Sequence, residues 1–208
     1  MKDKNTILTR LVTDKKKFEC EVSVKLEKSI KHGRKSGSYW YYPVQWAEEY
    51  GVVKVLLEEM SKDGNESYYN PQPLNKDERW PDCVVKDQQG KSIAVEVTEF
   101  VDERVVGLNQ RAKKDEDMCY RKWTDKAVVA KLTEIIRKKD TVSHGGKYAG
   151  FILVIHCDEF ALTSCILFPT LERTVFPQMK NIQKVFLICS HEPKLGGGRH
   201  PYRELRTA

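Results

Sequence analysis

Apolar and polar residues follow two different periods along this chain. Residues 18–26 alternate strictly between the two kinds, which predicts a half-buried strand ahead of the main core. Residues 43–62 begin with a proline, and their apolar side chains recur every three or four positions, which predicts a helix. The same spacing predicts a second helix over 124–139, with a threonine or aspartate as its N-terminal cap.

Two β-rich stretches lie close together in the middle of the chain. Residues 80–86 and 92–100 alternate in polarity, and the short segment between them contains Gln88, Gln89 and Gly90. A three-residue hairpin loop needs a left-handed residue, and glycine adopts that conformation most readily. The pattern therefore predicts a β-hairpin that turns about Gln89.

Two further stretches are almost continuously apolar. Residues 148–156 and 184–189 have strand length, and such runs are typical of strands covered on both faces. An extended, proline-containing segment precedes the hairpin, and a short helix is predicted near 167–173. The coarse order is strand, helix, three extended segments, helix, strand, short helix, strand. We therefore expect an α/β fold with a mixed central sheet flanked by helices and an extra N-terminal strand.

Length and composition limit the class of protein. The chain has 208 residues, of which 40% are hydrophobic and 32% charged, which fits one globular domain over 1–208. We expect a core over about 43–190, an N-terminal arm over 1–38 and a flexible C-terminal tail over 191–208. The sequence shows neither a membrane-length apolar run nor a secretory signal, and its six cysteines form no C-x-x-C motif. A soluble cytoplasmic protein without a membrane partner is the expectation.

The predicted hairpin brings two acidic residues together. If it turns about Gln89, the numbers of paired residues sum to 178, so that Asp82 faces Glu96. One hairpin face would then be apolar and pack the core, while the other would carry the two acids. Opposed carboxylates suit a hard divalent cation, Mg²⁺ or Mn²⁺, and hydrolysis of phosphodiester bonds. A solvated polar face, with the acids splayed apart or paired with basic residues, is the structural alternative.

These residues resemble a nuclease signature. The run Arg79-Trp80-Pro81-Asp82, followed after thirteen residues by Glu96-Val97-Thr98, is similar to the motif of the PD-(D/E)XK nuclease superfamily. The resemblance implies a restriction endonuclease-like core and a Mg²⁺-dependent endonuclease with Asp82 and Glu96 as metal ligands. It also implies a catalytic lysine two residues after the second acid, where this chain has Thr98.

The missing lysine leaves three interpretations open. Thr98 could hold the water through its hydroxyl group, a lysine from elsewhere could reach the site, or the fold could have lost catalysis and kept binding. The candidates for a lysine from elsewhere lie in the second helix. They are Lys126, Lys131 and Lys139, of which Lys139 continues the apolar stripe.

Other groups could support such a site. Nucleases of this class often use an acid from the first core helix, and Glu49 lies on the apolar stripe of that helix. A basic loop followed by aromatic residues could contact phosphates and bases, although aromatics more commonly cover a core. The candidate nucleic-acid contacts are Lys31, Arg34, Lys35 and Tyr39.

The net charge of +6 permits a polyanionic partner. We therefore expect a metal-dependent nuclease that acts on nucleic acid, with DNA as the expected substrate, and we allow for a homodimer. The alternative is a catalytically inactive nuclease-like domain that binds nucleic acid or a protein partner.

Overall fold

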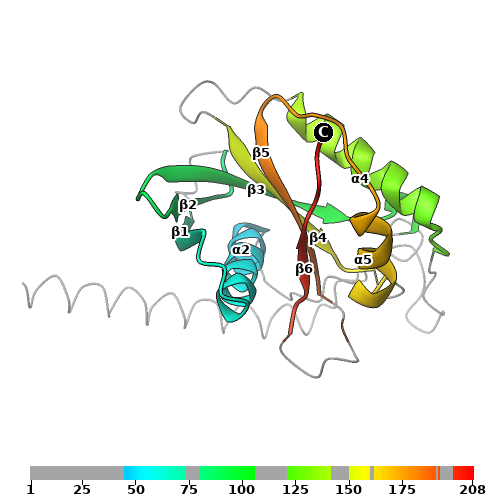
Figure 1. Cartoon of the computed structure of the whole chain (residues 1–208), viewed down its shortest axis with the longest axis horizontal. Coiled ribbons are helices and arrows are strands. Elements are labelled where there is room, and N and C mark those ends of the chain that lie inside the picture. Colours follow the sequence, from blue (N-terminus) through cyan, green and yellow to red (C-terminus); the bar gives the residue numbers. More distant parts are fainter. Residues whose placement is uncertain are drawn as a thin grey trace, which may run out of the picture.

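The computed structural model describes residues 45–73, 80–105, 121–141, 150–159, 162–190, 192 and 199–208. Outside them lie the expected N-terminal arm with its strand, and the four candidate nucleic-acid contacts Lys31, Arg34, Lys35 and Tyr39. Figure 1 shows the described elements, which in chain order are α2 (Gln45–Lys62), β1 (Tyr68–Pro73), β2 (Cys83–Asp87), β3 (Ser92–Phe100), α4 (Asp125–Asp140), β4 (Phe151–Cys157), α5 (Ser164–Glu172), β5 (Ile182–Cys189) and β6 (Tyr202–Glu204).

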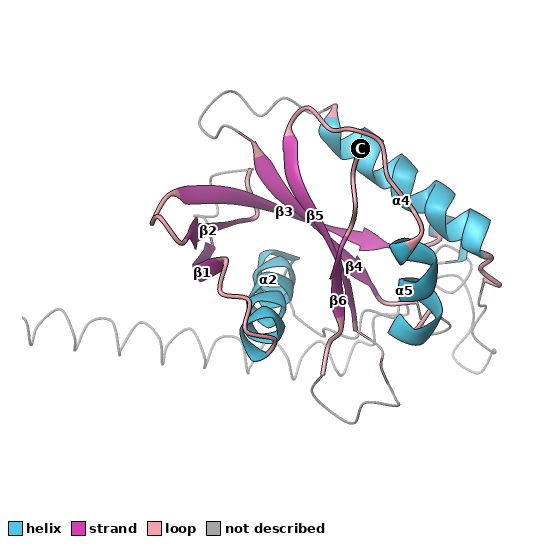
Figure 2. Ribbon diagram, in the orientation of Figure 1, coloured by secondary structure: helices cyan, strands magenta, loops and turns pink. Residues whose placement is uncertain are grey.

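The described strands form one six-stranded mixed sheet in the order β1-β2-β3-β4-β5-β6. Strands β1, β2 and β3 make an antiparallel meander, β3, β4 and β5 run parallel, and β6 is antiparallel to β5. Figure 2 shows the sheet with its flanking helices. The predicted α/β class, with a mixed sheet flanked by helices, is confirmed, and so is the predicted order from the first helix to β5.

The β2–β3 hairpin has the predicted register. Cys83 pairs with Val95 and Val85 pairs with Ile93, so the numbers of paired residues sum to 178. Gly90 has φ +79° and donates its N–H to the carbonyl oxygen of Asp87 at 2.8 Å. The Asp87 carboxylate also accepts the N–H of Lys91 at 2.9 Å, which closes the turn. The left-handed glycine and this local cap hold the register, as expected for a short hairpin loop.

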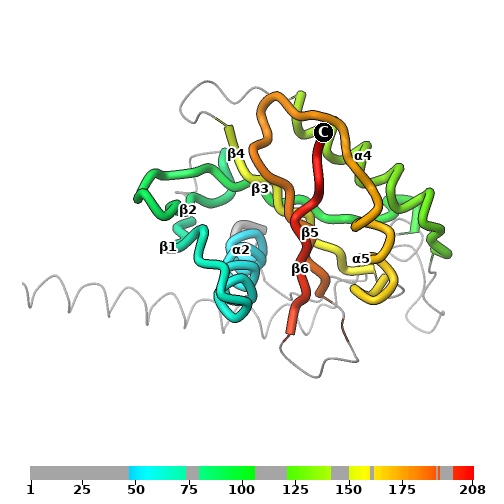
Figure 3. Tube along the Cα trace, in the orientation of Figure 1, coloured from blue at the N-terminus to red at the C-terminus, as the bar shows by residue number. Residues whose placement is uncertain are grey.

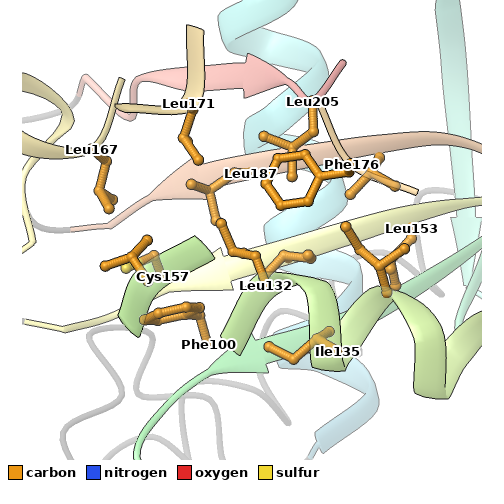
Figure 4. Packing of buried hydrophobic residues seen from close by; sticks show 14 of the residues in the cluster. Phe100, Leu132, Ile135, Leu153, Cys157, Leu167, Leu171, Phe176, Leu187 and Leu205 are labelled. Carbon is orange, nitrogen blue, oxygen red and sulfur yellow. The ribbon is translucent and has the colours of Figure 1, made fainter. Parts of the chain in front are cut away.

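Each face of the sheet packs against its own helices. Residues Val52, Val53, Leu56 and Met60 of α2 are buried against one face, together with Cys83 and other residues of the strands. Helices α4 and α5 cover the other face, and Figure 4 shows their packing in this second cluster, which includes Phe100, Leu132, Leu153, Leu171 and Leu187. Strand β4 lies between the two layers and is buried along its whole length, as its apolar run predicted.

The face of the hairpin that carries Glu96 is therefore not an open surface. Ala94 and Phe100, on the same side of β3 as Glu96, are buried in the cluster under α4. The expectation that only one hairpin face packs the core is wrong, because a central strand of a layered α/β sheet is covered on both sides. The acidic pair consequently lies beside a helix.

The C-terminal residues are part of the fold. Strand β6 pairs with β5, Leu205 is buried in the core, and Arg199 forms an ion pair with the buried Glu59 of α2 at 2.7 Å. Figure 3 shows the chain end running along β5. The expected flexible tail over 191–208 is thus wrong for 199–208. Strand β6 is short and polar, so the sequence showed no apolar pattern there. Such a strand is held at the edge of the sheet mainly by backbone hydrogen bonds.

None of the described helices has the length and apolarity needed to span a bilayer.

Candidate functional site

Asp82 lies at the open end of the β2–β3 hairpin. It precedes the first residue of β2, and continuing the observed register places it opposite Glu96. Its Oδ2 atom accepts the backbone N–H of Val97 at 2.8 Å. Among the residues that the structure describes, none hydrogen-bonds to its other oxygen. One oxygen of Asp82 thus accepts a hydrogen bond at the end of the hairpin, and the second oxygen remains available for a ligand.

Glu96 connects three segments of the chain. Its side chain is buried, and its Oε2 atom accepts the indole N–H of Trp80 at 3.0 Å. Its Oε1 atom pairs with the ammonium group of Lys139, which comes from the last turn of α4. The segment before β2, strand β3 and helix α4 therefore converge on one carboxylate.

Lys139 reaches Glu96 because of its place on α4. It follows Ile135 by four positions and so continues the buried stripe formed by Val128, Leu132 and Ile135. Its aliphatic stem can lie along this apolar stripe while the ammonium group extends to the sheet, and 26% of the side chain remains exposed. The other two candidates do not do this: Lys131 pairs with Glu134 at 3.2 Å and Lys126 is exposed.

The end of α4 is anchored by the residue after Lys139. The Asp140 carboxylate accepts the backbone N–H groups of Lys180, Asn181 and Ile182 at 2.7 to 3.1 Å, just before and at the start of β5. Burial raises the pKa of Asp140, but these three donors outweigh it and hold the pKa below its usual value. This contact joins α4 to the sheet beside the turn that carries Lys139.

Asp140→Ala should therefore lower the free energy of unfolding by about 1 to 2 kcal/mol, because three backbone donors lose a charged acceptor near the surface. An exposed acid of the same helix provides the control, since Glu134→Ala should change stability by less than about 0.5 kcal/mol. Urea unfolding at pH 7 measures both. Equal effects of the two substitutions would show that Asp140 is no anchor.

The electrostatics of the acidic pair favour a bound cation. Burial, and to a smaller extent the nearby Glu96, raises the pKa of Asp82 to about 6, although the Val97 N–H and Lys139 oppose this rise. If all three side chains are ionised, the two carboxylates and Lys139 carry a net charge of −1. A positive ligand would therefore relieve an unfavourable arrangement of charge.

The two remaining candidates, Thr98 and Glu49, differ in their position relative to the acidic pair. Thr98 lies two residues after Glu96 on the same face of β3 and is half-buried, so it remains a candidate for contact with water or substrate. Glu49 is half-buried in α2, and α2 packs against the opposite face of the sheet from Glu96. We therefore leave Glu49 out of the site. Among the described residues, no group of three or more His, Cys, Asp or Glu side chains is arranged to hold a metal ion.

Two contacts of the site were not anticipated from the sequence. The sequence does hold a signal for the bond from Trp80 to Glu96, because extending the hairpin register beyond Cys83 would place Trp80 opposite Thr98 and diagonally beside Glu96. The Asp140 anchor has no such signal in the sequence, since its partners lie about forty residues away.

Searches against protein-family models, curated proteins and solved structures found no match to this chain.

Proposed function

We propose that the protein is a divalent-metal-dependent nuclease that hydrolyses phosphodiester bonds, with DNA as the expected substrate. The convergence of Asp82, Glu96 and Lys139 carries this proposal. Two acids and one lysine are the set of groups that the nuclease signature uses. Here the lysine comes from α4, and Thr98 stands at the position where the signature has it.

The arrangement of elements supports the proposal. A helix, an antiparallel three-strand meander, a second helix and a strand parallel to the third follow one another as α2, β1-β2-β3, α4 and β4. This is the order of the restriction endonuclease-like core. We therefore propose that fold for the chain and place its catalytic hairpin at β2 and β3.

The residues present fit a hard divalent cation. Asp82 offers an oxygen that takes no hydrogen bond from a described residue, and each Glu96 oxygen carries two lone pairs and so can accept more than one contact. Asp82 and Glu96 would hold the ion, most simply Mg²⁺ or Mn²⁺, with water completing its coordination. Such an ion supplies Lewis-acid activation of water and neutralises charge on the phosphate.

Lys139 would act on the phosphate and on the attacking water. An ammonium group has three N–H donors, and the bond to Glu96 uses one of them. The others can donate to a phosphate oxygen or hold a water molecule beside the scissile bond. Because Lys139 is already held by Glu96 and by the anchored end of α4, little reorganisation is needed when negative charge develops on the phosphate.

One observation favours the alternative function. Both oxygens of Glu96 already have partners within the protein, Trp80 and Lys139, so the network is also what a purely structural ion pair would form. In that case the domain would bind nucleic acid or a protein without cleaving it. The two functions differ in what the acids do when a metal is added.

Cleavage assays test the proposal directly. With Mg²⁺ or Mn²⁺ the protein should nick or degrade DNA, and Asp82→Ala and Glu96→Ala should each lower the rate by at least about a hundredfold, since each removes a metal ligand. Glu99→Gln is the matched control, because Glu99 is an exposed acid of the same strand on the opposite face. Activity that survives both alanine variants, or no cleavage of DNA or RNA with either metal, would rule out the nuclease.

A further inference from the structure

Trp80 makes a directed contact with the acidic pair. Its indole N–H donates to Oε2 of Glu96 at 3.0 Å, while Lys139 takes the other oxygen. The ring makes a T-shaped contact with that of Phe151, with the centroids 5.9 Å apart and an interplanar angle of 85°. Trp80 also packs against the hydrophobic cluster under α4 and is only partly exposed. The donor is therefore carried by a ring that the core holds in place.

The two donors to Glu96 differ in stiffness. A lysine ammonium sits at the end of a flexible chain, whereas an indole has two rotatable bonds and only one donor. A hydrogen bond from this held indole to Oε2 restricts the rotamers of the Glu96 side chain even when Lys139 moves. Hydrogen bonds of this kind to a metal-ligating group are what orient it for the metal.

We propose that Trp80 is a positioning residue that fixes the Glu96 carboxylate for the cation and for Lys139. This inference rests on the proposed nuclease function and adds a residue to its site. An aromatic ring beside a nuclease site could instead stack on a base of the substrate. The packing argues against stacking, because the ring is only partly exposed, packs against Phe151 and the cluster under α4, and donates its N–H to Glu96.

Trp80→Phe is the informative change, since it keeps an aromatic ring against Phe151 and removes the N–H. We expect the dissociation constant for Mg²⁺ to rise by about 10- to 100-fold and kcat to fall by a similar factor, with KM for DNA within about twofold of wild type. Trp123→Phe is the matched control, because Trp123 packs against Phe100 in the same cluster, with the centroids 4.8 Å apart. That control should leave all three quantities near wild type.

Nuclear magnetic resonance gives a readout that does not depend on cleavage. The indole N–H resonance of Trp80, assigned by its loss in Trp80→Phe, should move in Glu96→Gln and should shift saturably when Mg²⁺ is titrated into the wild type. A merely packed tryptophan would respond to neither. Absence of both responses would overturn the inference.

The other outcomes separate this inference from the proposed function. Wild-type Mg²⁺ affinity and kcat in Trp80→Phe would overturn the positioning role, and so would a rise in KM alone, which would indicate stacking. A wild-type protein that neither binds Mg²⁺ nor cleaves nucleic acid would overturn the nuclease function itself. If Trp80→Phe does not fold, benzothienylalanine at position 80 keeps both rings and replaces the N–H by sulfur, and the same expectations apply.

Discussion

Replacing Lys139 by methionine should lower metal-dependent cleavage by about 10² to 10³-fold, because the site then loses its only described lysine that pairs with an acid of the hairpin. Methionine keeps most of the apolar stem and so preserves the packing of α4 on the sheet. The loss of the ammonium group should also raise the pKa of Asp82 above its wild-type value of about 6, since Lys139 lowers it. Initial cleavage rates and a carbon-detected titration of the Asp82 carboxyl measure the two effects.

Two variants separate a catalytic Lys139 from a structural one. Lys138→Met removes the exposed neighbouring charge and should leave cleavage within about twofold of wild type if general surface charge has little effect. Thr98→Lys should leave wild-type cleavage unchanged or lower it, because Lys139 already serves the site, and it should restore part of the activity lost in Lys139→Met. If Lys138→Met and Lys139→Met lose activity equally, Lys139 has no special role. An increase in activity in Thr98→Lys alone would show that the lysine position is truly vacant.

Asp82→Asn should stabilise the metal-free protein by about 1 to 3 kcal/mol at pH 7 to 8. The pKa of Asp82 rises from its ordinary value of 3.8 to about 6 on folding, and each unit of pKa corresponds to about 1.4 kcal/mol. Asparagine removes the charge, and its side-chain oxygen can still accept the N–H of Val97. Urea unfolding of both proteins without metal gives the difference in free energy of unfolding.

The pH dependence of that difference has a definite sign. Below about pH 3.8 Asp82 is protonated in both states and contributes nothing. Between 3.8 and about 6 the native state keeps its proton while the unfolded chain loses it, so the wild type loses stability as pH rises. Above that window the deficit is constant. The gain from Asp82→Asn should therefore be near zero at pH 3.5 and complete by about pH 7.

Metal should reverse the order of stability. A cation that binds only the native state stabilises it by mass action, and the neutral amide is a weaker ligand than the carboxylate. Millimolar Mg²⁺ or Mn²⁺ should thus raise the melting temperature of the wild type more than that of Asp82→Asn. If the substitution destabilises the metal-free protein and metal shifts both melting temperatures equally, Asp82 has a structural role, and the nuclease proposal loses its main physical support.

Local sequence determined the elements of this fold and the pairing of its hairpin. Apolar periods of two and of three to four residues marked β2, β3, α2 and α4, and continuous apolar runs marked β4 and β5. Both kinds of pattern depend only on near neighbours in the chain. A short loop with glycine at its left-handed position predicted the register of β2 and β3, and that register places Asp82 opposite Glu96. Strand β6 carried no such pattern, because an edge strand of three residues is held by its neighbour rather than by its own side chains.

Only the tertiary structure decided which lysine completes the site. Helix α4 carries three candidate lysines. Their spacing in the sequence predicts the helix face on which each one lies, but it does not predict how far the helix extends across the sheet. That distance depends on the packing of the α4 stripe over β3 and β4 and on the Asp140 anchor to the start of β5. Both are contacts between residues far apart in the chain, and they place Lys139 against Glu96. The tertiary structure also decided that α4 covers the hairpin face that carries Glu96, because a strand in the middle of this sheet has helices on both sides.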